Sequence, residues 1–131
     1  MRYMLMMNVP SGGGGYQINN WAPEDFRAHI DFMQRYNKDL KETGEFVDAQ
    51  GLTPPGEAKL VRAGKSGTPI TDGPFPETKE FLAGFWLIDV ESAARAYELA
   101  AKASAAPGPG GAPLNMPIEV RQVMSGPPDE L

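Results

Sequence analysis

The run from Thr71 to Glu80, which reads TDGPFPETKE, places ionisable groups on a backbone with little freedom. Asp72 can fold its carboxylate back onto nearby amides, as aspartate does at the start of turns. Pro74 and Pro76 each fix φ and lack a donor N–H, and Pro74 pushes Gly73 toward an extended conformation. Stiff loops of this kind often aim polar groups for function. The predicted loop would hold four charged side chains in fixed directions: Asp72, Glu77, Lys79 and Glu80.

Asp72 is the first candidate for catalysis. On such a loop its carboxylate could take a proton from a substrate carbon or orient a substrate hydroxyl. The alternative is structural, because a carboxylate that accepts amide hydrogen bonds would stabilise the turn by about 1 kcal/mol. The sequence leaves both interpretations open.

His29, the one histidine of the chain, is the second candidate. It lies three residues after Phe26 and four before Met33, on the edge of the apolar stripe of a predicted helix. Imidazole exchanges a proton near neutral pH, so His29 could act as a general base if it faced a pocket. A partly buried histidine paired with Asp25, one helical turn back, would explain the position without function. The residue types favour this structural interpretation.

Six further residues could contact a substrate, and five of them lie in the Thr71–Glu80 loop. Lys79 could hold a carboxylate group, and the guanidinium of Arg121 suits bidentate binding of a carboxylate. The alternatives are exposed salt bridges in the loop, which stabilise little, a packing role for Phe75 and an outward-facing Arg121. The predicted substrate-binding residues are Gly73, Pro74, Phe75, Glu77, Lys79 and Arg121.

The chain offers few ligands for a metal or a redox group. It has no cysteine and one histidine, which excludes disulfides and thiol catalysis and leaves no zinc-type spacing. An all-oxygen Mg²⁺ or Ca²⁺ site stays open. No dinucleotide fingerprint and no serine–histidine arrangement is present. We therefore predict neither a metal nor a cofactor.

The elements that must position these residues follow from the apolar pattern. A helix is predicted from Pro23, a favoured first-turn residue, with Gly44 just past its end. Its apolar stripe is Phe26, Ile30, Met33 and Leu40. A second helix is predicted over about 91–103, with Asp89 as its cap. Strands are predicted over 2–9, 45–52, 81–90 and 118–124, with a hairpin of 58–63 and 68–71.

This order, β-α-β, a hairpin, then β-α-β, predicts an α+β ferredoxin-like sandwich. Two helices can cover only one face of such a sheet, yet Met4, Met6 and one side of 81–90 place apolar residues on the other face. If that face were exposed to solvent, the surface would carry more apolar area than monomers usually show. We therefore expect a homodimer in which two sheets pack face to face.

Length, charge and hydropathy limit the classes of partner that we expect. At 131 residues the chain should form one domain, which we place at 1–124 with 125–131 as a flexible polar tail. A net charge of −5 and scattered basic residues argue against a nucleic-acid partner. No apolar run approaches a membrane span of about 18 residues, so a membrane partner is not expected. Residues 1–9 are too short for a signal peptide, and a cytoplasmic protein is the default.

Several stretches occur together in one known family. In chain order they are MRYMLMM at residues 1–7, GLTPP at 51–55, TDGPFPETKE at 71–80, GFWLIDV at 84–90 and IEVRQVM at 118–124. Together they resemble the DGPF branch of the YCII-related proteins, from about residue 1 to residue 124. The resemblance implies a dimeric α+β barrel, a bacterial origin and frequent genomic association with extracytoplasmic-function sigma factors. It supplies no settled activity.

The wider YCII-related group has a proposed His/Asp active site, by likeness to muconolactone-isomerase-type enzymes. The DGPF branch generally lacks a clear equivalent of that histidine, so the mechanism does not transfer directly to His29. Two functions are then possible, and a third interpretation is a stable dimer that binds no ligand. One is cofactor-free proton transfer on a small polar molecule in the barrel, by Asp72 and His29. The other is a non-catalytic ligand-binding or protein-interaction module linked to sigma-factor regulation.

Overall fold

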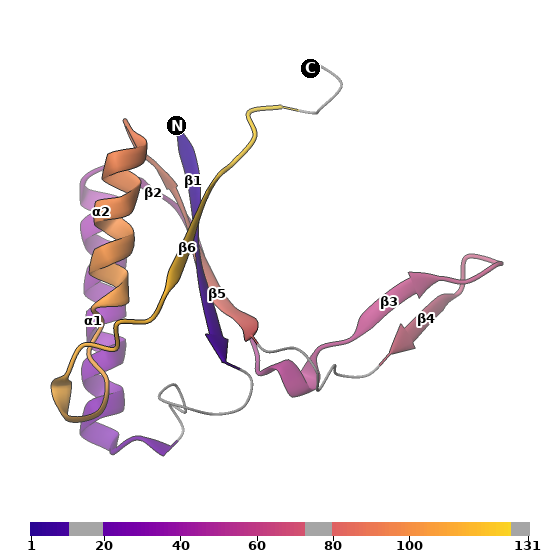
Figure 1. Ribbon diagram of the computed structural model, residues 1–131, viewed down its shortest axis with the longest axis horizontal. Helices are drawn as coiled ribbons and strands as arrows, with labels where there is room; N and C mark the ends of the chain where they lie inside the picture. Colours follow the sequence, from indigo (N-terminus) through magenta and orange to yellow (C-terminus); the bar gives the residue numbers. More distant parts are fainter. Residues whose placement is uncertain (11–19, 73–79, 127–131) are drawn as a thin grey trace.

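The computed structural model describes residues 1–10, 20–72 and 80–126, and these form a sheet with two helices on one face (Figure 1). The elements are β1 (Arg2–Pro10), α1 (Pro23–Glu42), β2 (Phe46–Gly51), β3 (Leu60–Ala63), β4 (Pro69–Asp72), β5 (Glu80–Asp89), α2 (Ala93–Ser104) and β6 (Ile118–Gln122). Four strands pair antiparallel in the order β2-β5-β1-β6. This α+β arrangement is compatible with the predicted ferredoxin-like fold.

The two central strands carry the core. In β1 every second side chain is buried against the helices, and Leu5 lies opposite Trp86 of β5. Leu5 and Ile88 are fully buried. The sequence predicted a strand here, and apolar side chains on both of its faces are typical of a central strand.

The sheet face opposite the helices carries a second apolar group, which we call the bare face. The pairing of β1 with β5 shifts by one residue between Met7 and Asn8, so that Ala83 of β5 has no partner residue on β1. This shift determines which side chains of β5 lie on the bare face. Polar side chains of the edge strands flank the group, with Asp48 on β2 and Glu119 on β6. The apolar residues of the bare face are only partly buried: Met4, Met6, Leu82, Phe85 and Leu87.

Helix α1 begins at Pro23 and is followed by Gly44 at φ 80°, as the sequence predicted. Its buried side differs from the predicted stripe, because His29, Tyr36 and Leu40 are buried whereas Phe26 is 42% exposed. Tyr36 can enter the core because its hydroxyl donates to the Leu99 carbonyl at 2.7 Å. Burial raises the pKa of the Tyr36 phenol, so the hydroxyl stays a donor.

Helix α2 is capped by Ser92, so the predicted cap at Asp89 is wrong. The Ser92 hydroxyl accepts a hydrogen bond from the Arg95 amide at 3.2 Å. Asp89 cannot cap because β5 runs through it, and its own amide donates to the Glu45 carbonyl at 2.9 Å. The Asp89 carboxylate instead lies 3.1 Å from the amine of Met1.

The hairpin of β3 and β4 forms a separate two-stranded sheet, which confirms the predicted pairing. It projects away from the four-stranded sheet, on the side that the helices do not cover (Figure 1). We call residues 59–72 the arm. No helix of the described residues is long and apolar enough to cross a membrane.

Candidate functional site

A pocket of about 240 Å³ lies between α1 and the β2–β5 side of the sheet. Helix α1 contributes His29, Met33 and Asn37, which share a face because they are spaced by four residues. Apolar and aromatic side chains make up most of the remaining wall, Trp86 among them. A mostly apolar cavity with a few convergent polar groups is typical of a small-molecule site.

Among the described residues that line the pocket, His29 is the one with a titratable side chain. It is 2% exposed, and its Nδ1 lies 3.0 Å from the carbonyl oxygen of Pro107. The Trp21 ring meets the imidazole edge to face, with centroids 5.3 Å apart. Because a carbonyl oxygen only accepts, Nδ1 must carry the hydrogen. The neutral ring is then the tautomer whose Nε2 lacks a proton, which is the form that can act as a base.

Asn37 supplies an oriented amide. Its Oδ1 accepts a hydrogen bond from the Trp86 indole nitrogen at 2.8 Å, so the carbonyl end is engaged. The group that Asn37 can offer a ligand is therefore its NH₂ donor. His29, whose imidazole can exchange a proton, and the donor Asn37 thus line the same pocket from one helix.

Gly84 allows the two strands of the wall to lie close together. A Cβ on Gly84 would lie 2.8 Å from the Gln50 carbonyl oxygen and 3.3 Å from Cα of Gly51. No ordinary side chain fits there, because real Cβ atoms do not approach so closely. Gly84 therefore sets the spacing of β2 and β5 where they line the pocket.

The structure describes the side chains of two predicted site residues, His29 and Arg121, and these two lie apart. His29 lines the pocket, and the Pro107 carbonyl rather than Asp25 holds its Nδ1. Arg121 is on β6, 73% exposed, with its Nε 4.0 Å from Glu119, so it does not lie with His29. The Asp72 backbone ends β4, where it pairs with Leu60. The Asp72 side chain and the residues Gly73, Pro74, Phe75, Glu77 and Lys79 lie outside the described residues.

The sequence reasoning missed Asn37, Gly84 and the β2 residues of the wall. A signal for Asn37 exists, because His29, Met33 and Asn37 recur every four residues along α1. Gly84 in an otherwise apolar strand is a second signal, since a strand glycine often marks a close backbone approach. Neither signal identifies a pocket without the partner strand.

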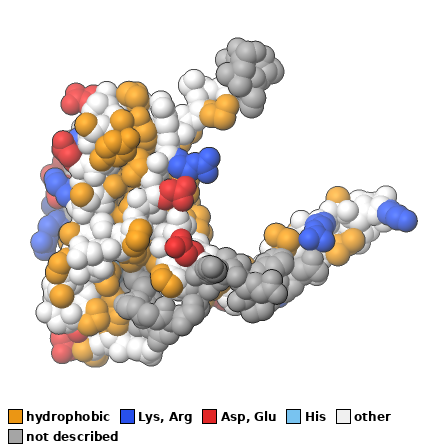
Figure 2. Space-filling model, in the orientation of Figure 1, with side chains coloured by type: hydrophobic (Ala, Val, Ile, Leu, Met, Phe, Trp, Pro, Cys, Tyr) orange, Lys and Arg blue, Asp and Glu red, His pale blue; other side chains and the backbone are white. Residues whose placement is uncertain are grey.

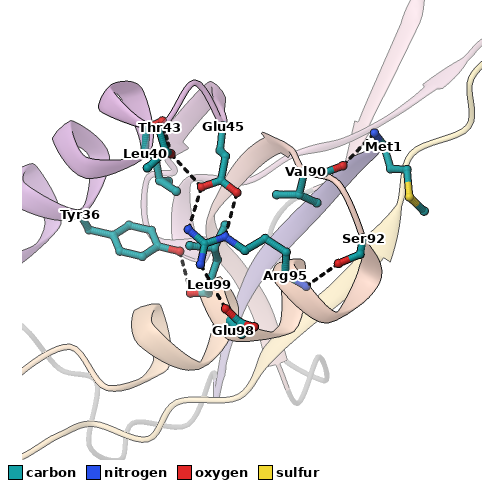
Figure 3. Close-up of polar contacts among 10 residues, drawn as sticks. All are labelled: Met1, Tyr36, Leu40, Thr43, Glu45, Val90, Ser92, Arg95, Glu98 and Leu99. Carbon is teal, nitrogen blue, oxygen red and sulfur yellow. Dashed lines mark hydrogen bonds and ion pairs between the residues drawn. The ribbon is translucent and has the colours of Figure 1, made fainter.

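A smaller hollow of about 90 Å³ lies between α1 and α2, beside Glu45 and Arg95. Figure 3 shows these two side chains facing each other, with the Arg95 Nε and Nη2 each 2.9 Å from a Glu45 oxygen. The Arg95 hydrogen bond lowers the pKa of the Glu45 carboxyl below its ordinary value. Because the Arg95 and Glu45 charges pair with each other, we assign this hollow a structural role rather than a ligand-binding one. In the described residues, no three His, Asp or Glu side chains are grouped to hold a metal.

Comparison with known proteins gives two findings. A family model described as the YCII-related domain matches residues 1–111. The chain is also 32% identical over 80 residues to the uncharacterised protein R00369 of Rhizobium meliloti (strain 1021). That match covers 61% of this chain and 64% of the Rhizobium protein. Neither finding distinguishes the DGPF branch, which stays a prediction.

Proposed function

The chain belongs to the family of YCII-related domain proteins, and we propose that it binds a small organic molecule beside His29 and exchanges a proton with it. The observation that carries the proposal is the buried imidazole in the pocket wall, held at Nδ1 by the Pro107 carbonyl. The pocket lies on the helix side of the sheet. A proton-transfer role for Asp72 stays a separate prediction.

The size of the pocket limits the ligand. An engineered apolar cavity of about 150 Å³ accepts benzene, and drug-sized ligands occupy about 300–1,000 Å³. At about 240 Å³ the pocket suits one ring with a short substituent. Trp86 and Met33 favour an apolar body, whereas His29 and Asn37 favour one polar group on it.

The proton transfer follows from the hydrogen bond at Nδ1. The Nδ1–H···O bond to Pro107 persists whether Nε2 is neutral or protonated, because the carbonyl accepts in both states. A positioned base of this kind contributes about 10²–10⁴-fold to a rate. No metal or cofactor is required for the step.

Ring ¹⁵N NMR tests the proposal directly, because the chain has one histidine and its signals need no assignment by mutation. We expect the neutral ring to be the Nδ1–H tautomer. Phenol, benzoate and indole, each added at millimolar concentration, should shift the His29 ring signals and the Trp86 indole N–H together. If none of the three moves either signal, the pocket is not a binding site.

Two variants separate catalysis from binding. His29→Gln keeps hydrogen-bonding capacity but cannot exchange a proton, so it should bind the probe that shifts the wild type yet turn over no substrate. Asn37→Ala should weaken probe binding and leave the His29 tautomer unchanged. A His29→Gln protein with full turnover would contradict the role of His29 as the base.

We also propose that the protein is a homodimer joined through the bare face. The partly exposed Met4, Met6 and Phe85 on that face support it, because each large apolar side chain that becomes buried contributes about 1.5–3 kcal/mol. Light scattering during size exclusion should give twice the 14.2 kDa of one chain. A mass of one chain would contradict the dimer.

A further inference from the structure

We propose that the arm, residues 59–72, packs against a second copy of this chain and widens the contact made by the bare face. The inference rests on the proposed homodimer and adds a second contact surface to it. Three observations carry it: the uncovered apolar side chains of the arm, the side of the sheet from which it projects, and its charge.

The arm makes too few contacts within itself to be stable without a packing partner. Strands β3 and β4 pair only with each other among the described strands, and each is four residues long. Isolated two-stranded hairpins are marginally stable in water. Yet Leu60, Val61 and Ile70 are 42%, 58% and 52% exposed. Leu60 and Ile70 share one face of the hairpin and Val61 lies on the other, so both faces present apolar surface.

The position of the arm points to a second copy as the occupant. The arm belongs to the connection between β2 and β5, which runs from Gly51 to Glu80. These two residues lie at the same end of the sheet, because β2 and β5 are antiparallel neighbours. Figure 2 shows the body and the arm at an angle, with an open hollow between them. A copy that covers the bare face must therefore meet the arm of the first, and two-fold symmetry makes the contact reciprocal.

The charges agree with this partner. The arm carries Lys59, Arg62 and Lys65 against the single acid Asp72, whereas the whole chain has a net charge of −5. The rest of the chain is therefore strongly acidic. At its edges the bare face carries the acids Asp48 and Glu119, with the base Arg121 next to Glu119 on β6. A basic arm and an acidic body favour the contact between copies and make it sensitive to salt.

Sedimentation equilibrium of the full chain tests the energetic contribution of the arm. The double variant Val61→Asn/Ile70→Asn should raise the dimer dissociation constant by roughly tenfold or more, because it replaces an apolar side chain on each face. Tyr97→Asn is the matched control, since Tyr97 is 59% exposed on α2 and belongs to neither surface. The control should dimerise as the wild type does. An unshifted His29 ring signal in each variant shows that the pocket stays folded.

A second measurement needs no disruptive substitution. The chain has no cysteine, so Ser66→Cys in the turn of the arm gives one site for a nitroxide spin label. Labelled protein mixed with ¹⁵N-labelled, label-free protein should broaden amide signals of β1 and β5 in the second copy and spare those of α2.

The outcomes distinguish the arm from the dimer and from the pocket. If the wild type is a dimer but its dissociation constant is unchanged by Val61→Asn/Ile70→Asn, the role of the arm is overturned and the dimer stands. The same holds if the amide signals of β1 and β5 are not broadened. A monomeric wild type overturns both. The His29 NMR titration is independent of both outcomes.

Discussion

At the scale of single residues, the Glu45–Arg95 pair joins α2 to the connection between α1 and β2. Arg95 also lies 3.1 Å from Glu98, and Thr43 donates to Glu45 at 2.7 Å, so the pair is part of a small network (Figure 3). The Arg95 and Glu45 side chains are 27% and 14% exposed. Partial burial makes such a bidentate pair stronger than an exposed one.

Arg95→Met should therefore lower the free energy of unfolding by about 1 to 3 kcal/mol at pH 7, measured by urea denaturation. Methionine keeps most of the apolar stem and leaves the Glu45 carboxylate without its partner. Arg35→Met is the control, because Arg35 is exposed on α1 and is not part of this pair. Equal losses in the two variants would show that the pair contributes nothing specific.

The same pair predicts a pH dependence. Arg95 lowers the pKa of Glu45 from its ordinary 4.5, so the folded state favours the charged carboxylate. The stabilisation is complete above the ordinary value and is lost as pH falls through the lower pKa of the folded state. The difference between wild type and Arg95→Met should thus shrink below about pH 4.5. A difference that stays constant to lower pH would contradict the linkage.

His29 shows what sequence reasoning reached at this scale and what it did not. The residue type and its place on α1 identified it as a candidate, yet the pattern put it at the edge of the stripe and favoured Asp25 as its partner. Its Nδ1 partner, Pro107, lies 78 residues away along the chain. Contacts of that separation depend on how α1 packs against the segment after α2, and helical spacing does not contain this information.

At the scale of elements, the start of α2 offers a test of local signals. Ser92→Ala should cost about 1 kcal/mol in unfolding free energy, because the helix loses its side-chain cap. Ser92→Asp should retain most of the stability, since aspartate caps as well and complements the helix dipole. Asp89→Asn should cost little, as its exposed pair with the Met1 amine is weak. A larger cost at Asp89 than at Ser92 would contradict the assigned cap.

The sequence predicted the elements themselves well, and the reason is local. Apolar alternation in 2–9 and 81–90 predicted central strands, and Pro23 and Gly44 predicted the ends of α1. The cap of α2 could not be fixed in this way, because Asp89 and Ser92 are both good capping residues three positions apart. The choice depends on how far β5 continues, and pairing with Glu45 decides that. The direction in which the β3–β4 hairpin projects is likewise absent from its own residues.

At the scale of the whole molecule, the two faces of the sheet have different proposed roles: ligand binding on the helix-covered face and association of two copies on the bare face. The pocket is built from α1, β2 and β5 of one chain, with Met7 of β1 in its wall, and Phe85 belongs both to its lining and to the bare face. The bare face, with the arm beside it, has no covering element among the described residues (Figure 1). Binding at His29 and association through the bare face should therefore be separable by mutation.

Met6→Asp tests that separation. The substitution places a charge at the centre of the bare face, opposite Phe85, where a face-to-face dimer would have to bury it. Light scattering should then give the mass of one chain, whereas Tyr97→Asp, with the same charge on the exposed side of α2, should leave the dimer intact. The His29 ring signals and their response to phenol should persist in the Met6→Asp monomer, since the described lining of that pocket comes from one chain. If the ring signals are lost when the dimer dissociates, while the monomer keeps its helical circular dichroism, then the two faces are coupled and the pocket depends on the partner copy.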